Sequence, residues 1–257
     1  MTETAETRGP VYYEGQGRFG GFTGNGLKLF AMGIMLIDHV AYALLFSTET
    51  AAVYWPMRII GRLAFPIFAY MIAVGARHTH DIKKYLLRLL AFTVISEIPF
   101  DCAFGFAGKG QIMELAHQNV FLTLFLGLLT LAFLRLFQKG LPRYYMIPSA
   151  AVLLLTMAAA EFLNTDYAGV GVLCIFLFYV GADKKTAKAP LFALAIFVLS
   201  FDRNTLINVT ELFALVSLVP ILLHNGQKGA KMNRWVFYAF YPGHLTVLWL
   251  IRSLLQR

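Results

Sequence analysis

Ionisable side chains lie inside several long apolar segments of this chain, where they could do chemistry out of contact with bulk water. In hydrocarbon each such group costs about 3 kcal/mol unless it is paired or hydrated, so a retained one is a candidate for function. Most of them fall in the first three segments. They are Asp38, His39, Arg58, Arg62, Arg88, Glu97 and Asp101, with His244 near the C-terminus.

His39 is the candidate general base, because an imidazole titrates near neutral pH and suits proton transfer. Asp38 precedes it directly and therefore points about 100° away on a helix. We expect Asp38 to pair with Arg58 or Arg62 rather than to orient His39. Arg62 offers the positive charge that a developing oxyanion needs.

Two pairs of charged residues have helical spacing. Arg58 and Arg62 are i and i+4, as are Glu97 and Asp101, so each pair presents one charged face of a helix. Two arginines facing two carboxylates nearly neutralise each other, which predicts a contact between the second and third helices. The alternative to a role in chemistry is that these charges form a purely structural ion-pair network. The candidate catalytic residues are His39, Asp38, Arg62 and Glu97.

A polar run before the fourth apolar segment could line the entrance for an acceptor substrate. In it, His117 offers an imidazole, and Asn119 either contacts substrate or caps the following helix. The candidate substrate-binding residues are Arg58, Asp101, His117, Asn119, Tyr241 and His244.

Two basic loops are candidates for binding a polyanion, although the same charges could instead meet anionic lipid. The last loop also offers glycine backbone. The residues concerned are Arg77, His78, Lys83, Lys84, Arg88, Asn225, Gly226 and Lys228. No Walker-type glycine loop, HExxH or GxSxG motif occurs, so nucleotide hydrolysis, metalloprotease and serine-hydrolase chemistry lack their motifs. No metal is expected.

The elements that must position these residues are membrane helices. Of the 257 residues, 58% are hydrophobic and 14% are charged, against about 25% charged in an average soluble domain, and the mean hydropathy is +0.65. This composition excludes disorder, a collagen-like fibre and a disulfide scaffold. We expect an all-α bundle in the lipid bilayer over residues 27–257, after a polar tail over residues 1–26.

Apolar runs of helix length predict about nine transmembrane helices, with eight to ten as the range. Two of the runs are short, and Pro66, Pro99 and Pro242 lie inside runs and predict bends. The runs are residues 27–46, 57–75, 85–104, 119–137, 144–163, 167–181, 189–201, 208–223 and 237–255.

Lys and Arg gather in alternate loops, so the net charge of +8 indicates membrane topology rather than nucleic acid binding. One side carries only Lys109, Arg203 and Arg257. The N-terminus is therefore expected in the cytoplasm and the C-terminus outside. The opposite, cytoplasmic side carries Arg8, Arg18, Lys28, Arg77, Lys83, Lys84, Lys139, Arg143, Lys184, Lys185, Lys188, Lys228, Lys231 and Arg234.

Cys102 and Cys174 lie in apolar segments without CxxC spacing and are expected to be packing residues.

Several short motifs, in their order along the chain, resemble the TraX family. The resemblance covers nearly everything after residue 26, and in the family the last-loop motif usually reads YNG, where this chain has His224 in place of the tyrosine. The motifs are IDH at 37–39, GRLAFPIF at 61–68, SEIPFD at 96–101, HNGQKG at 224–229 and FYAFYPGH at 237–244.

The resemblance implies an acetyltransferase of the bacterial inner membrane with acetyl-CoA as donor. It is similar to the wider group of transmembrane acyltransferases that includes heparan-alpha-glucosaminide N-acetyltransferase. By motif, His39, Arg62 and Glu97 would be its functional residues. The family is named for acetylation of a pilin N-terminus, yet the acceptor does not follow from the fold, and a glycan or lipid amine or hydroxyl is equally compatible.

Two questions stay open at the level of sequence. The acetyl group could rest covalently on His39 or pass directly to the acceptor. A proton-coupled transporter or channel could use the same intramembrane charges as a path, which is the alternative function.

Overall fold

The computed structural model describes residues 21–45, 50–104, 117–182, 188–202 and 206–255, and its regular structure is helical apart from one pair of two-residue strands. The strands β1 (Phe201–Asp202) and β2 (Leu206–Ile207) pair antiparallel. The helices are α1 (Gly24–Leu44), α2 (Ala51–Gly61), α3 (Ala64–His78), α4 (Ile82–Phe104), α5 (Val120–Gly140), α6 (Met146–Phe162), α7 (Ala168–Gly181), α8 (Lys188–Phe197), α9 (Val209–Leu212), α10 (Leu218–Leu222) and α11 (Arg234–Leu255), with 3₁₀ turns η1 (Val198–Ser200) and η2 (Phe213–Ser217).

The all-α prediction is confirmed, and each predicted apolar run falls on a helix or a chain of short helices. The prediction of about nine transmembrane helices is not confirmed. Within the described residues, three stretches are long and apolar enough to cross a membrane: Gly24–Leu44, Ala51–His78 and Val120–Gly140. Four other apolar helices have 10–17 residues, shorter than the roughly 20 that span a bilayer without help from adjoining loops. These apolar helices fit a membrane protein.

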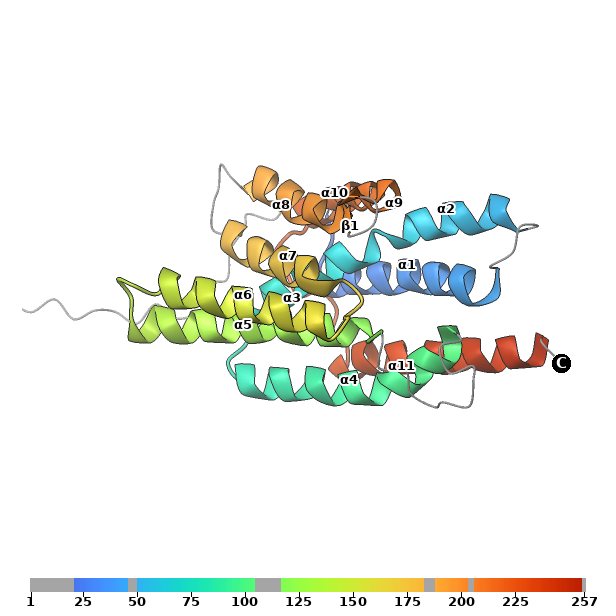
Figure 1. The fold of residues 1–257 in the computed structure, drawn as a ribbon, viewed down its shortest axis with the longest axis horizontal. Helices are drawn as coiled ribbons and strands as arrows, with labels where there is room; N and C mark the ends of the chain where they lie inside the picture. Colours follow the sequence, from blue (N-terminus) through green and yellow to red (C-terminus); the bar gives the residue numbers. More distant parts are fainter. Residues whose placement is uncertain (1–20, 46–49, 105–116, 183–187, 203–205, 256–257) are drawn as a thin grey trace, which may run out of the picture.

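Successive helical segments run in alternating directions along the long axis of the molecule (Figure 1). The helices α1, α4, α6, α8 and α11 point one way, and α3, α5 and α7 point the other. Lys28 at the start of α1, Arg77 at the end of α3 and Lys139 at the end of α5 therefore belong to helix ends on the same side. This alternation agrees with the predicted topology, whose orientation in a membrane stays a prediction.

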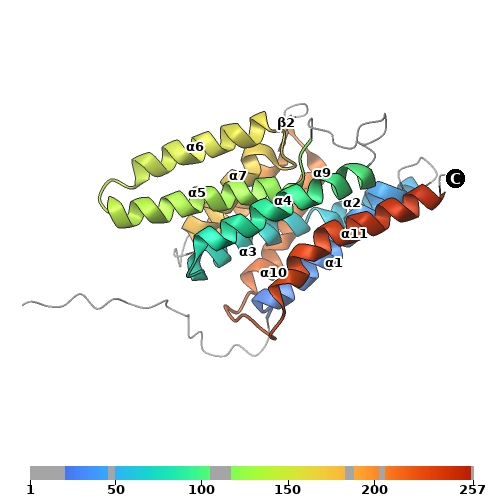
Figure 2. The ribbon, with the colours of Figure 1, turned by 90° about the horizontal axis from the view of Figure 1, so that it is seen from below.

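The core forms around α3, which packs against α1, α5 and α7. Residues along most of α3 are buried, including Phe65, Ile67, Tyr70 and Ala73. The helices α4 and α11 lie side by side in both views (Figures 1 and 2), and α6 packs on α5 and α7. The first three apolar segments, which carry most of the candidate residues, are thereby held against a common centre.

One break interrupts the second apolar segment, between α2 and α3. The backbone N–H groups of Arg62 and Leu63 bond to carbonyls three residues back, which tightens the turn. Pro66 falls in the first turn of α3, where its missing N–H costs little, so the bend expected there lies just before it. Pro99 and Pro242 lie inside α4 and α11 as predicted.

Two glycines permit close contacts between helices. A Cβ atom at Gly127 of α5 would overlap Ile175 of α7, and one at Gly61 of α2 would overlap the side chain of Asp38 on α1. Residues 1–20 of the expected polar tail lie outside the described residues, while α1 begins at Gly24, slightly before the predicted 27. Cys102 and Cys174 are free thiols, in agreement with the expected packing role.

Single cysteines should report the orientation of the bundle. In a background without Cys102 and Cys174, we expect a cysteine at Lys228 to react with a membrane-impermeant maleimide only from the cytoplasmic face. A cysteine at Lys109 should react only from the outer face, because the two positions lie on opposite sides of the predicted topology. Comparing intact cells with inverted vesicles measures this, and reaction of both positions from one face contradicts the nine-helix topology.

Candidate active site

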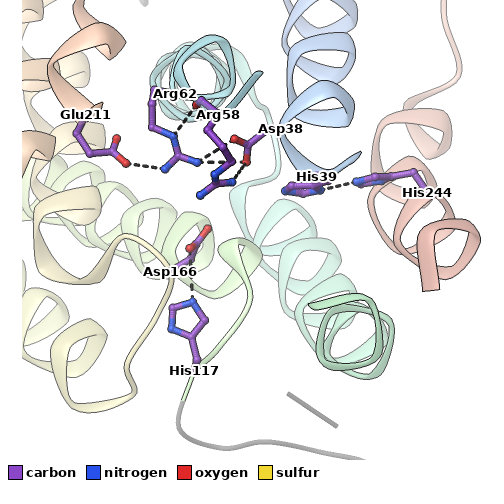
Figure 3. A network of polar contacts seen from close by, with 8 residues as sticks. All are labelled: Asp38, His39, Arg58, Arg62, His117, Asp166, Glu211 and His244. Atoms are coloured by element: carbon purple, nitrogen blue, oxygen red, sulfur yellow. Dashed lines mark hydrogen bonds and ion pairs between the residues drawn. The ribbon is translucent and has the colours of Figure 1, made fainter. Parts of the chain in front are cut away.

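A cavity of about 190 Å³ lies between the first four helices, the start of α5 and the residues that precede α5 and α7. It gathers most of the candidate residues of the first three apolar segments. Figure 3 shows the charged members facing one another across it. The polar lining residues are Asp38, His39, Tyr42, Arg58, Arg62, His117, Asp166 and Tyr167, and the apolar walls include Met35, Phe65, Phe68, Phe100 and Phe104.

Asp38 is the centre of a buried ion-pair network. Its carboxylate accepts hydrogen bonds from Arg58 Nη1 at 2.7 Å and from Arg62 Nη2 at 3.0 Å. Arg62 Nη1 lies 2.5 Å from Glu211 Oε1 of α9. None of the four side chains is more than 20% exposed. The prediction that Asp38 pairs with Arg58 or Arg62 is confirmed, and the acid contacts both.

The two arginines differ in how many of their donors are used. Arg62 uses all three nitrogens, since Nε also donates to the carbonyl of Arg58 at 3.2 Å. Among the described residues, Arg58 finds a hydrogen-bond partner through Nη1 alone, and its guanidinium stacks 4.9 Å from the ring of Tyr42. Figure 3 shows this guanidinium turned toward Asp166 and His117. Arg58 therefore keeps N–H groups that could bind a substrate oxygen.

His39 is held by another histidine. Its Nδ1 lies 2.7 Å from Nε2 of His244 on α11, and the two rings are nearly parallel with centroids 5.0 Å apart. Nδ1 of His244 lies in turn 2.7 Å from the carbonyl oxygen of Phe240. Asp38 does not orient His39, as predicted. His244 and Tyr241 do not line the cavity, because α11 stands behind His39, and their predicted contact with substrate stays a prediction.

His117 and Asp166 form a second polar pair at the cavity wall. His117 Nε2 lies 3.6 Å from Asp166 Oδ1, and the imidazole ring stacks on Phe100. The nearby carboxylate of Asp166 raises the pKa of His117 above its ordinary value, and the charges of Glu97 and Asp101 add to this against the effect of burial. His117 lines the cavity, and its expected place beside a substrate entrance stays a prediction.

The predicted contact between the two arginines and the acids of α4 is wrong. Glu97 instead accepts from the side-chain amide of Asn119 and from its backbone N–H at 3.4 Å. The side-chain oxygen of Asn119 accepts from the backbone N–H of Phe121 and caps α5, which confirms the capping alternative. The reason is that Glu97 lies beneath the start of α5, whereas the arginines face α1 and α9. Glu97, Asp101 and Asn119 are buried and do not line the cavity.

A cluster of basic side chains lies near the start of α1, at the opposite end of that helix from the cavity. Burial lowers the pKa of His224 below its ordinary value against a hydrogen bond with the Gln227 backbone, and the positive charges of Lys188, His78 and Lys28 lower it further. His224 Nδ1 lies 2.9 Å from the hydroxyl of Tyr70. Lys28, His78, Lys188 and His224, called the basic cluster from here on, include one residue of the predicted polyanion site.

The other predicted polyanion ligands are dispersed. Arg77 donates to the carbonyl of Tyr179 and stacks on its ring at 4.4 Å. Lys83 is exposed, and Lys84 forms an exposed ion pair with Asp81 at 3.3 Å. Arg88 lies beside Tyr85, 5.7 Å from the ring, and beside a tyrosine of α11. These side chains do not form one continuous cluster, because α3 and α4 turn their basic residues to different neighbours, and their binding of a polyanion stays a prediction.

The glycine-containing last loop makes backbone contacts with the start of α1. The carbonyls of Gln227 and Lys228 accept from the N–H groups of Gly24 and Asn25 at 2.8 and 3.0 Å, so they satisfy the start of the helix. Gly226 has a φ of 76°, which favours glycine, and Asn225 caps the turn through Gln227 N–H. The predicted use of Asn225 and Gly226 to cradle a polyanion stays a prediction, and the Lys228 side chain is exposed.

Sequence reasoning missed two acids of the site. Glu211 lies inside the run 208–223, so an acid within an apolar segment was a usable signal. Asp166 lies between two runs, and nothing in its local sequence marks it. Among the described residues, no group of three or more His, Cys, Asp or Glu side chains could hold a metal ion.

Comparisons with known proteins give one family. A sequence model of the family described as "TraX protein" matches residues 23–252. The chain is 30% identical over 242 residues to the "Probable fimbrial assembly protein FimC, serogroup H1" of Dichelobacter nodosus, which covers 90% of this chain and 96% of that protein. No solved structure matches.

The ion-pair network predicts unequal effects of its two acids. We expect Asp38→Asn to lower the free energy of unfolding by about 3–5 kcal/mol, because it removes the acid that pairs with Arg58 and one of the two that pair with Arg62. Glu211→Gln should cost less, since Arg62 keeps Asp38. Thermal melting of the purified protein in detergent measures both, with Asp81→Asn in the exposed pair as the control that should melt like the wild type. A larger loss for Glu211→Gln than for Asp38→Asn would contradict the central position of Asp38.

The His117 and Asp166 pair predicts a pH-dependent contribution to stability. Because the folded-state pKa of His117 is raised, the pair stabilises the protein fully below the unfolded pKa of about 6.5 and loses this effect as the pH rises through the folded pKa. The melting temperature of Asp166→Asn should therefore fall below that of wild type at about pH 5.5 and approach it at about pH 8.5. An equal difference at both pH values would show that the pair does not titrate.

Proposed function

The chain belongs to the TraX family, and from this premise we propose that it is an integral membrane acetyltransferase that moves acetyl from cytosolic acetyl-CoA to an amine or hydroxyl acceptor. The observation that carries the proposal is the cavity in which an imidazole and an arginine with unused donors stand side by side. We place the protein in a bacterial inner membrane with about nine helical segments across the bilayer and the N-terminus in the cytoplasm.

The proposed reaction needs a base for one proton and donors for one oxyanion. The acceptor N–H or O–H gives its proton to His39 as its heteroatom forms a bond to the thioester carbon. Negative charge then develops on the carbonyl oxygen, and Arg58 has the N–H groups to bind it. When the C–S bond breaks, the proton on His39 returns to the departing CoA sulfur, so the imidazole ends the cycle neutral.

Arg62 takes a supporting role in this proposal. Its three nitrogens are engaged by Asp38, Glu211 and the Arg58 carbonyl, so it holds the neighbouring arginine and acid in place. Asp38 binds one nitrogen of Arg58, which fixes the guanidinium beside the cavity. In this arrangement Asp38 and Arg62 position the donor of Arg58.

The donor is proposed to bind with its phosphates at the basic cluster. Lys28 and His39 lie on the same helix, roughly 16 Å apart along its axis at a rise of about 1.5 Å per residue. A phosphopantetheine arm is an extended chain of comparable reach, and the cavity of about 190 Å³ has room for its thioester end but not for the nucleotide. The basic cluster contains the positive charge that phosphate groups need.

The acceptor is proposed to approach past His117 and Asp166, which stand on the cavity wall away from the basic cluster. The Dichelobacter nodosus relative is named as a fimbrial assembly protein, which makes a fimbrial or pilin-like N-terminus one acceptor to test, beside glycan and lipid amines or hydroxyls. Transfer of labelled acetate to cell-envelope fractions, in cells with and without the gene, identifies the acceptor.

His39→Ala should abolish acetyl transfer while the protein still binds CoA, because the imidazole is proposed for chemistry and not for docking the donor. Loss of a well-placed base commonly lowers the rate by about 10²–10⁴. The measurement is release of CoA from acetyl-CoA by purified protein with an amine acceptor, together with CoA binding by calorimetry. His80→Ala, which removes a histidine from an exposed loop, is the matched control and should keep full activity.

Two outcomes would count against the proposal. Activity of His39→Ala within about threefold of wild type would remove His39 from the chemistry, since that is far less than loss of a base costs. Failure of the wild type to cleave the thioester with any acceptor would favour the transporter alternative, because a carrier has no need to release CoA.

A further inference from the structure

A chain of hydrogen bonds links His39 to the backbone of α11. It runs from His39 Nδ1 to His244 Nε2 at 2.7 Å and from His244 Nδ1 to the carbonyl oxygen of Phe240 at 2.7 Å. His244 is buried and is packed between Phe240, at 4.7 Å between ring centroids, and Tyr241, at 5.6 Å. These rings leave its imidazole little freedom to turn away from His39.

The last member of the chain sets the direction of every bond in it. A carbonyl oxygen can only accept, so Nδ1 of His244 carries a hydrogen and donates it. In a neutral imidazole the other nitrogen is then an acceptor, so His244 Nε2 receives a hydrogen bond from Nδ1–H of His39. A neutral His39 is thereby fixed as the tautomer with its hydrogen on Nδ1 and its lone pair on Nε2.

Nε2 of His39, which carries the lone pair, is the nitrogen that can act as a base in the cavity. His39 lines the cavity and His244 does not. Among the described residues no hydrogen-bond partner is found for Nε2 of His39, and Figure 3 shows the ring edge away from His244 turned to the side of Asp38 and Arg58. The base and the candidate oxyanion donor thus face the same space.

We propose that His244 is a positioning residue, which holds His39 as the Nδ1–H tautomer so that the basic Nε2 faces the acceptor. The inference rests on the proposed acetyl transfer. When the acceptor loses its proton, Nε2 of His39 gains it, and Nδ1–H continues to donate to His244, so no second proton has to move. The proton on Nε2 is the one delivered to the CoA sulfur as the C–S bond breaks.

Three other neighbouring side chains give His39 no hydrogen bond. Asp38, on the same helix, is occupied by Arg58 and Arg62. Phe104 and Tyr241 contact the imidazole through ring packing, with centroids 5.1 and 6.0 Å away. The orientation of His39 therefore depends on α11, and its hydrogen bond to His244 joins positions 205 residues apart.

The direct test is the tautomer itself, measured by nitrogen-15 NMR of protein labelled at histidine, with the His39 signals assigned by their loss in His39→Ala. We expect the neutral Nδ1–H form in the wild type and loss of this single form in His244→Ala. A wild-type His39 with its hydrogen on Nε2 would overturn the inference, whatever the activity of the protein. Because this readout needs no substrate, it stands even if the proposed acetyl transfer fails.

The kinetic test separates positioning from substrate contact. We expect His244→Ala to lower kcat by about 10- to 100-fold, as for groups that orient metal-bound histidines, with the KM for acetyl-CoA and for the acceptor unchanged. His244→Gln supplies an oxygen that can accept from Nδ1–H and should recover most of kcat. A raised KM in His244→Ala, or a His244→Gln variant as slow as His244→Ala, would overturn the positioning role.

A matched control lies two residues away on the same helix. Thr246 also bonds a backbone carbonyl of α11, that of Pro242, at 2.8 Å, but it does not contact His39. Thr246→Val should keep kcat within about twofold of wild type. If it fell as far as His244→Ala, the effect would belong to α11 as a whole and the inference would be wrong.

Discussion

The carboxylate of Asp38 is the group on which the geometry of the site depends. It lies between Arg58 and Arg62 and bonds both. It can do so because the residue of α2 that faces it is Gly61, where a Cβ atom would overlap the acid. Without this acid, two guanidinium groups would share a space that is largely closed to water, where like charges repel strongly. One side chain of α1 thus decides how closely α2 approaches and where both arginines point.

Glu211, the second acid, balances the charge of the network and gives the two arginines different roles. It neutralises the positive charge that Asp38 alone leaves uncompensated, and Arg62 then has a partner on every nitrogen. The break between α2 and α3 contributes, because Arg62 stands at it and can reach α9, while Arg58 remains one turn earlier over the cavity. A neutral network with one partly used arginine can bind a new negative charge without first giving up an ion pair.

The sequence predicted features that depend on local order, and it missed those that depend on helix rotation and packing. The apolar runs, the cap by Asn119 and the turn of Asp38 away from His39 follow from hydropathy, capping chemistry and the 100° step of a helix. The partners of Glu97 and Arg62 do not, because i and i+4 spacing shows which residues share a face but not which helix that face meets. The hydrogen bond between His39 and His244 joins the first and last helices, and no local sequence pattern predicts it.

The two ends of α1 have opposite electrostatic character, and this bears on what the molecule could bind. At one end the arginines are matched by acids, so the cavity has a polar but nearly balanced wall. At the other end the charges of Lys28, His78 and Lys188 act on His224, and burial together with these charges lowers its pKa. A ligand that satisfied both ends would be an elongated anion with a small, weakly charged reactive group at its far end. Acetyl-CoA has this distribution of charge, with its phosphates remote from the thioester. The proposed donor is thus favoured by the separation of charge along a single helix, independently of which acceptor receives the acetyl group.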